Sequence, residues 1–132
     1  MAGSRCVDIQ FAGTIEYESA LDLMKQLQDK RINDEINDTL LILEHPEIVT
    51  VGPRARNDGI VAPPEYPTYP VDRGGGLTWH GPGQIVCYPI FKWDLPGEDS
   101  VAAIIQIIEE WVINSLEHLH IPAVRDGRMQ GV

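Results

Sequence analysis

The segment that most restricts this chain is residues 73–84, RGGGLTWHGPGQ, in which five of the twelve residues are glycine and one is proline. Glycine allows a backbone to approach a ligand closely and leaves N–H groups that can hold an oxyanion or a carbonyl oxygen. If the four residues after the three glycines are extended, Thr78 and His80 point to one side and Trp79 points to the other, toward packing. With Arg73 in front, the segment predicts a glycine-lined wall beside one cation and two hydrogen-bonding side chains. Such a wall suits a carbonyl-bearing ligand with an apolar tail.

A plainer interpretation of the segment stays open. It can be a glycine-rich turn between two strands, with His80 hydrogen-bonded and Arg73 on the surface, because short glycine motifs also occur without a ligand. Two nucleotide-binding motifs do not fit. No Gly-Lys-Ser/Thr follows, so the segment is not a phosphate-binding P-loop, and it does not match the dinucleotide pattern Gly-x-Gly-x-x-Gly.

The rest of the chain predicts a mixture of helices and strands. Apolar residues at helical spacing predict a helix over 15–30, with Thr14 as its N-cap. A second, longer helix is capped by Asp99 or Ser100, and its apolar stripe runs from Val101 to Leu119 and is expected to pack against a sheet. Residues 54–70 are rich in Pro, Gly, Asn and Asp and predict mostly loop. Extended structure is predicted over residues 6–11, 39–43, 48–51, 85–91 and 121–124. The predicted fold is therefore α/β or α+β with one sheet.

Composition narrows the class of protein. A chain of 132 residues with 43% hydrophobic and 23% charged residues is typical of one globular domain, here residues 1–132. Ten basic residues against twenty acidic ones give a net charge of −10, which disfavours nucleic acid and anionic membrane as partners. No apolar run reaches the ~18–20 residues that span a bilayer. The acidity mainly favours solubility.

The cysteines and the first residues predict a cytoplasmic protein. Cys6 and Cys87 are too few and too far apart for a disulfide framework, which favours a reducing compartment. Residues 1–10 contain no apolar core of a signal peptide. Because Cys87 lies in an apolar predicted strand, we expect a buried, inert thiol there.

The glycine segment and its surroundings resemble the signature of lipoyl(octanoyl) transferases, the enzymes that transfer octanoyl groups in lipoate synthesis. The matching residues are Arg-Gly-Gly at 73–75, Thr78, His-Gly-Pro-Gly-Gln at 80–84 and Tyr-Pro-Ile at 88–90. Upstream, LLILEHP at 40–46 and Thr50-x-Gly52 are also similar to that family, so the resemblance runs from about residue 8 to the end. Related lipoate ligases continue with Asp and Asn where this chain has Pro-Gly-Gln, and biotin ligases carry a different Gly-Arg-Gly pattern.

This resemblance implies a fold and a chemistry. The fold is the α/β (mixed α+β) catalytic domain of the biotin/lipoate protein ligase-like superfamily, incomplete at the C-terminus. The family moves octanoyl from the phosphopantetheine thiol of acyl carrier protein to a lysine of lipoyl domains, in 2-oxoacid dehydrogenase complexes and the glycine cleavage H protein. The transfer passes through a cysteine thioester and uses no metal, no ATP and no other cofactor. The residues implied to contact the acyl group are Arg73, Gly74, Gly75, Gly76, Leu77, Thr78, Trp79 and His80.

The chain departs from the family in one respect. The family's catalytic lysine and cysteine both match positions beyond Val132, so no catalytic residue is assigned within this chain, and neither Cys6 nor Cys87 can take the role. Three explanations stay open: a fragment, which we favour; one half of a split enzyme; or a relative that binds acyl groups or the carrier without catalysis. If strands that belong to the sheet are absent, apolar surface is exposed, and we expect residues 1–132 made alone to be poorly stable or to aggregate.

Two further groups of residues have competing interpretations. The pair His118-x-His120 does not share a helix face at i, i+4, so a role at a helix end is favoured over zinc. His45 is expected to shape a turn after a strand and is only a weak candidate for the pocket. Arg54, Arg56 and Arg73 can form a basic patch that meets the acidic carrier protein, although ordinary surface charge is the plainer interpretation.

Overall fold

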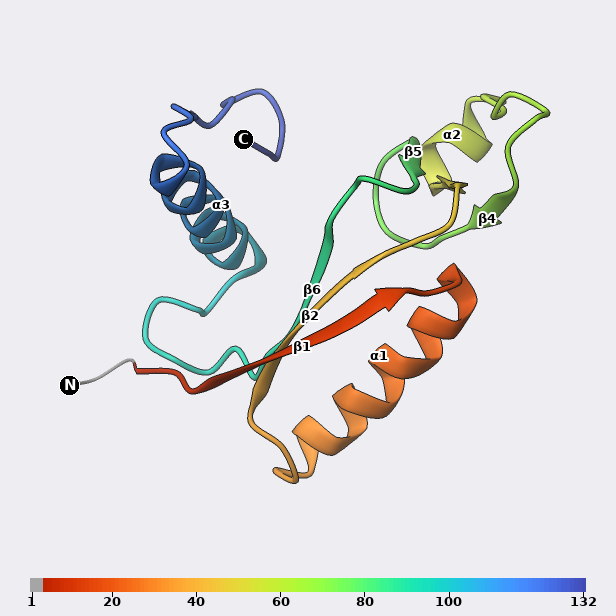
Figure 1. Ribbon diagram of the computed structural model, residues 1–132. Coiled ribbons are helices and arrows are strands. Elements are labelled where there is room, and N and C mark those ends of the chain that lie inside the picture. The colour runs from red at the N-terminus through yellow and green to blue at the C-terminus, as the bar shows by residue number, and fades with distance from the viewer. Residues whose placement is uncertain (1–3) are drawn as a thin grey trace. The chain divides into compact units, whose positions relative to one another are not determined.

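The computed structural model describes residues 4–132, and it contains the predicted mixture of helices and strands (Figure 1). Contacts divide the chain into two compact units, residues Cys6–Lys92 and a second unit made of residues 4–5 with Trp93–Val132. The prediction of one domain over residues 1–132 is not tested by this division. The elements, in chain order, are β1 (Val7–Thr14), α1 (Tyr17–Ile32), β2 (Asp38–Glu44), β3 (Ile48–Val51), α2 (Pro53–Asn57), β4 (Thr68–Pro70), β5 (Leu77–His80), β6 (Val86–Ile90) and α3 (Val101–His118).

The first sheet of the larger unit has the strand order β1-β2-β6. Strand β1 runs parallel to β2, and β2 runs antiparallel to β6, with Leu40 opposite both Ile9 and Pro89. The central strand β2 is the run DTLLILE, which is apolar on both faces. Such a run suits the centre of a sheet, where a strand has neighbours on both edges and little contact with water.

Helix α1 covers one face of this sheet. Ala20 of α1 and Leu41 are 0% exposed and Leu43 is 3% exposed, and these three residues form the centre of a hydrophobic core. The helix begins later than predicted, because β1 continues to Thr14, which lies opposite Glu44 in the strand register. Thr14 is therefore not the N-cap. That position is held by Glu16, which makes no capping hydrogen bond through its side chain.

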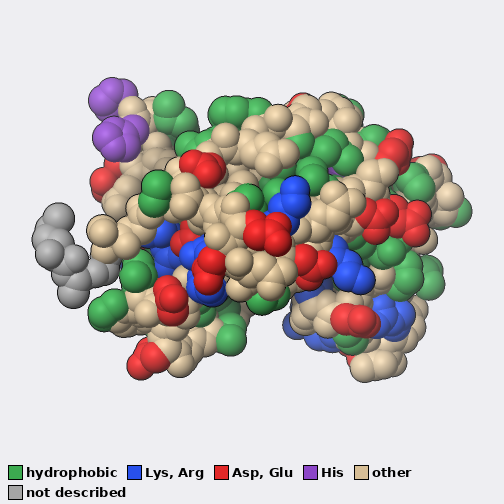
Figure 2. All heavy atoms as spheres, turned by 90° about the horizontal axis from the view of Figure 1, so that it is seen from below, with side chains coloured by type: hydrophobic (Ala, Val, Ile, Leu, Met, Phe, Trp, Pro, Cys, Tyr) green, Lys and Arg blue, Asp and Glu red, His purple; other side chains and the backbone are tan. Residues whose placement is uncertain are grey.

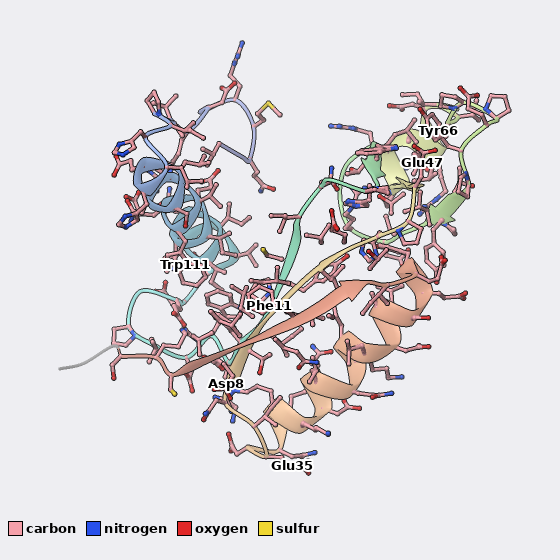
Figure 3. All side chains as sticks on the ribbon, viewed as in Figure 1. Asp8, Phe11, Glu35, Glu47, Tyr66 and Trp111 are labelled. Atoms are coloured by element: carbon pink, nitrogen blue, oxygen red, sulfur yellow. The ribbon has the colours of Figure 1, made fainter. Side chains whose placement is uncertain are left out.

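The opposite face of the same sheet is also apolar, but it is exposed. Ile9 and Phe11 are 59% and 77% exposed, and their strand partners Leu40 and Ile42 lie on the same face. Figure 3 shows Phe11 on the side of β1 that faces away from α1. Hydrophobic side chains also reach the surface on the face drawn in Figure 2, among acidic and basic ones. An apolar face of this kind supports the expectation that residues 1–132 alone are prone to aggregate.

The second sheet has the strand order β4-β3-β5 and carries the glycine segment. Strand β3 runs parallel to β4 and antiparallel to β5. The prediction of mostly loop over residues 54–70 is confirmed, because residues 58–67 belong to no helix or strand. Two short elements occupy the ends of this stretch. Helix α2 starts at Pro53, whose fixed φ suits the first turn of a helix, and the short strand β4 closes the stretch.

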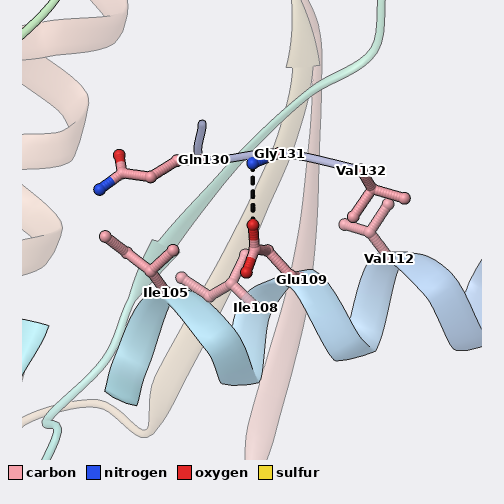
Figure 4. A pocket seen from close by; sticks show the side chains of 7 residues that line it. All are labelled: Ile105, Ile108, Glu109, Val112, Gln130, Gly131 and Val132. Atoms are coloured by element: carbon pink, nitrogen blue, oxygen red, sulfur yellow. Dashed lines mark hydrogen bonds between the residues drawn. The ribbon is translucent and has the colours of Figure 1, made fainter. Parts of the chain in front are cut away.

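The smaller unit is built on α3. Ser100 is its N-cap, with Oγ accepting a hydrogen bond of 3.1 Å from the N–H of Ala103, which decides between the two predicted caps. No residue of α3 is fully buried. Residues 121–124, predicted as extended, belong to no strand. The chain after α3 instead lies against the helix, and Glu109 accepts a hydrogen bond of 2.8 Å from the N–H of Gly131 (Figure 4). An open cavity of about 360 Å³ lies between these last residues and α3. Over residues 4–132, no helix is both long and apolar enough to cross a bilayer.

Candidate functional site

The three glycines of the predicted wall lie directly against the turn after β3. The N–H of Gly52 donates to the carbonyl of Gly76 at 2.9 Å, and the N–H of Arg54 donates to the carbonyl of Gly75 at 3.2 Å. A side chain at Gly52 would begin 2.3 Å from the carbonyl oxygen of Gly75, closer than two atoms can approach. The close contact therefore requires glycine at position 52.

Arg73 joins the two strands next to the wall. Its Nη2 donates to the hydroxyl groups of Thr50 and Thr78, each at 2.7 Å, and its Nη1 donates to the carbonyl of Gly74 at 2.8 Å. Thr50 and Thr78 face each other across β3 and β5. The predicted cation is thus exposed but held in place, and it lies beside Thr78 as the sequence suggested.

The tautomer of His80 follows from its neighbour Gln84. The side-chain amide of Gln84 donates to the carbonyl of Trp79 at 3.1 Å, which leaves its Oε1 as the acceptor for Nδ1 of His80 at 2.5 Å. Nδ1 of His80 therefore carries a proton. When the ring is neutral, Nε2 of His80 is an unprotonated nitrogen that can accept a proton or a hydrogen bond.

His45 is fully buried, at 0% exposure, and it is far more central than the sequence suggested. Its Nδ1 lies 2.8 Å from the carbonyl oxygen of Ile15, which can only accept, so Nδ1 is the donor. Its Nε2 must then accept from the hydroxyl of Tyr88 at 2.9 Å. Both nitrogens are satisfied, and the ring is fixed between α1 and β6.

Five aromatic rings gather around these residues. Tyr17 lies 5.1 Å from the ring of His45, 5.1 Å from Tyr69 and 6.3 Å from His80, and the rings of His45 and His80 are 5.6 Å apart. Tyr88 lies 6.0 Å from His45. The rings come from the start of α1, the turn after β2, β4, β5 and β6, so segments far apart in the sequence meet here.

Burial favours the protonated form of two tyrosines in this cluster, Tyr17 and Tyr88. Burial raises the pKa of Tyr88 to about 12, and the nearby Tyr17 adds to the shift. Burial also raises the pKa of Tyr17, while the charge of Arg73 lowers it and Tyr69 raises it. Strand β5 connects the aromatic cluster to the glycine wall, because it carries both Thr78, which accepts from Arg73, and His80, which belongs to the cluster.

Trp79 corrects the prediction that its side chain faces toward packing. It is 40% exposed, and its indole N–H donates to the carboxylate of Glu47 at 3.3 Å. Its ring lies across Gly81, where a side chain would begin 2.2 Å from the ring. Of the eight predicted residues, the structure brings Arg73, Thr78 and His80 together, while Trp79 points away from them.

The cysteines and the acidic groups add no reactive centre to this site. Cys87 is exposed, so the prediction of a buried thiol is wrong, because the side chain lies on the uncovered face of β6. Partial burial of the sulfur still raises the pKa of Cys87, which disfavours the thiolate. Within residues 4–132, no three His, Cys, Asp or Glu side chains lie close enough together to hold a metal ion.

Sequence reasoning missed Tyr17, Tyr69 and Tyr88 as site residues. Tyr17 was part of a helical apolar stripe, and Tyr69 lay in a stretch predicted as loop. Only Tyr88 could have been found from the sequence, because it belongs to the Tyr-Pro-Ile that follows the glycine segment and matches the family signature. The arrangement as a whole combines a polar wall, the fixed cation of Arg73, a histidine ring and a half-buried aromatic floor, which are features of a site for a small ligand.

Comparison with known proteins identifies the family. Residues 16–131 match the lipoyl protein ligase A/B catalytic domain, and the chain belongs to this family. An octanoyltransferase of Corynebacterium efficiens is 38% identical over 125 residues, which make up 95% of this chain and 48% of that protein. An octanoyltransferase of Chloroflexus aurantiacus is 38% identical over 134 residues, or 97% of this chain and 60% of that protein. The chain thus spans about half the length of these curated relatives.

Solved structures confirm the predicted fold. A T. acidophilum protein assigned as a lipoate protein ligase superposes with a TM-score of 0.60 at 16% identity, covering 94% of this chain and 53% of that one. The same protein with bound lipoic acid gives a TM-score of 0.57. At this identity the likeness concerns the fold alone.

Proposed function

We propose that this chain is part of an octanoyltransferase that moves octanoyl from acyl carrier protein to a lysine of lipoyl domains. The acceptors are lipoyl domains of 2-oxoacid dehydrogenase complexes and the glycine cleavage H protein. The observation that carries the proposal is the convergence of Arg73, Thr78 and His80 with the aromatic cluster on one glycine wall. Membership of the family and the octanoyltransferase relatives support the same activity.

The proposed reaction has two steps. A cysteine thiolate attacks the thioester carbonyl of the donor, forms a new C–S bond and releases the carrier's thiolate, which takes up a proton. The lysine amine of the lipoyl domain then attacks the enzyme thioester, forms an amide, loses a proton and releases the cysteine. Both catalytic residues, a lysine and this cysteine, are expected outside residues 1–132. Cys87 is unsuited because its pKa is raised, and Cys6 lies before β1, in no contact with the ring cluster.

In this reaction the residues of the wall bind and orient the donor. We propose that Arg73, Thr78 and His80 line the head of the acyl chain, that the backbone of residues 74–77 contacts the donor beyond that head, and that Trp79 braces the strand from its other side. No metal and no cofactor takes part in the proposed reaction. We also propose a cytoplasmic location, where the free thiols Cys6 and Cys87 would stay reduced.

The test is transfer of octanoyl from octanoyl-acyl carrier protein to an apo lipoyl domain, followed by mass spectrometry of the domain. It uses the protein isolated from its natural source, whose intact mass shows whether residues beyond these 132 accompany them. We expect one octanoyl group on the lipoyl lysine, and a loss of about 100-fold or more in the R73A and H80A variants, by analogy with the removal of other positioned polar groups. Full activity in R73A, T78A and H80A alike would refute the assignment of the wall.

A second function, binding of acyl groups or carrier without catalysis, has a distinct outcome. Octanoyl-acyl carrier protein would then bind without loss of its acyl group. Covalent capture of octanoyl by the protein, seen as a hydroxylamine-sensitive adduct, separates the transferase from the binding module. Capture only after addition of a second chain would indicate a split enzyme.

A further inference from the structure

In the glycine wall the backbone carbonyls are hydrogen-bonded within the described part of the protein, whereas the backbone N–H groups are not. The carbonyl of Gly74 accepts from Arg73, that of Gly75 from the N–H of Arg54, and that of Gly76 from the N–H of Gly52. Among residues 4–132, no acceptor is bound to the N–H groups of Gly74, Gly75 or Gly76. Gly75 has a φ of +107°, between neighbours with negative φ. Successive N–H groups in backbone that alternates in this way form a concave site for anions.

The three arginines around this wall differ in what they are free to bind. Arg73 is engaged by two threonine hydroxyls and a carbonyl. Arg56 donates to the carbonyls of Val51 and Val71, at 2.6 and 3.0 Å, and lies 3.9 Å from the exposed carboxylate of Asp72. Both arginines therefore brace the loop while they keep their positive charge, and of the predicted basic patch only Arg54 has donors that are not used within the described chain 4–132.

Arg54 is the third arginine beside the wall. Its side chain is exposed and makes no hydrogen bond or ion pair with another residue of the described chain 4–132. Its Nη2 lies 3.9 Å from the point where a side chain would begin at Gly76. A free guanidinium thus lies next to the free N–H groups, in a chain whose net charge is −10. Guanidinium and backbone N–H together are the usual donors for a phosphate.

We propose that Arg54 and the N–H groups of Gly74, Gly75 and Gly76 bind the phosphodiester of the donor's phosphopantetheine arm. This inference rests on the proposed function and adds the group by which the donor is recognised. Strand β5 separates this anion site from His80, and its four residues span about 10 Å at ~3.3 Å per residue. The arm would lie along β5, with the phosphate at the glycines and the thioester toward Thr78 and His80.

The experiment measures binding of 4′-phosphopantetheine and of pantetheine, which lacks the phosphate, by calorimetry at low salt. It compares the unmodified protein with R54Q, with R54K and with K25Q, which removes an equally exposed charge from α1. We expect the unmodified protein and K25Q to prefer the phosphorylated arm. R54Q should lose about tenfold in affinity for that arm alone, since it removes one charged hydrogen bond at an exposed position. R54K should keep part of the preference, because it keeps the charge without the planar fork.

Two results would overturn the inference: equal affinity of the unmodified protein for both arms, or the same preference in R54Q as in K25Q. Far-UV circular dichroism of R54Q confirms that the fold is kept. Octanoyl transfer is measured separately, so that the two proposals can fail independently. Transfer without any effect of Arg54 on binding defeats only this inference, whereas Arg54-dependent binding of the arm without transfer defeats the proposed function.

Discussion

The contact between Gly52 and Gly75 offers a sharp test of how the glycine wall is positioned. Alanine at position 52 places Cβ 2.3 Å from the carbonyl oxygen of Gly75, whereas real Cβ atoms keep at least 3.0 Å. The wall must therefore move by about 0.7 Å or more, and the hydrogen bonds from Gly52 and Arg54 to the wall must lengthen. Gly52 has a φ of −80°, which alanine adopts freely, so the effect is one of space and not of backbone conformation.

The expected cost of G52A is about 1–3 kcal/mol in the free energy of unfolding, as for other insertions into a tightly packed site. The control is G74A, because a side chain at Gly74 meets nothing within 4 Å and needs no positive φ. Urea unfolding gives the stability, and the amide resonances of Gly75 and Gly76 report the displacement. Octanoyl transfer should fall in G52A far more than in G74A. Unchanged resonances and an unchanged unfolding midpoint in G52A would refute the reasoning.

Three other variants test the buried polar contacts and the thiol. Y88F leaves Nε2 of the fully buried His45 without its hydrogen-bond donor. Urea unfolding should show a loss of about 1–3 kcal/mol in the free energy of unfolding. Stability equal to wild type would contradict this and would show that water replaces the hydroxyl. The pKa of Tyr88 is about 12 in the fold, against 10.0 for a free tyrosine. The neutral hydroxyl therefore stabilises the fold below pH 10, and this contribution is lost as the pH rises toward 12. In Y88F the free energy of unfolding should accordingly fall less steeply over this pH range. D38A removes a 4% exposed carboxylate that accepts from Nε of Arg31 at 2.6 Å and from the N–H of Lys92 at 2.9 Å. A loss of about 1–3 kcal/mol is expected because the backbone N–H loses its acceptor, while Arg31 keeps Asp34; a thermal midpoint within error of wild type would contradict this. C87A should retain full octanoyl transfer, and loss of transfer would reinstate Cys87 as the nucleophile.

Local patterns along the chain predicted most of the elements. Strand β3 lies at Ile48–Val51 as expected, and the apolar run around Leu41 forms the buried centre of a sheet. Ser100 caps α3 because a hydroxyl at that position reaches the free N–H of the first turn. Such features depend on residues close in sequence, and sequence alone can therefore reveal them.

Errors in the local predictions occurred where a distant contact decided the outcome. The start of α1 moved because Thr14 continues β1 through its pairing with Glu44. The exposure of Cys87 follows from the lack of any cover, among residues 4–132, on one face of its sheet, and no alternation of residues along β6 could show this. Strand propensity gives the period of a face but not what lies over it.

The site also combines features that neighbouring residues predict with features that depend on distant contacts. Neighbouring residues alone predict that a glycine segment at 73–76 leads into a strand at 77–80, and their spacing places Thr78 and His80 on one side of it. The tertiary structure decided that His45 and the tyrosines at 17, 69 and 88 surround this strand, and that Arg54 alone among three arginines stays free. The reason is physical: the ring contacts and guanidinium hydrogen bonds of the site join residues up to 63 positions apart in sequence, and only the packing of the sheets brings these residues together.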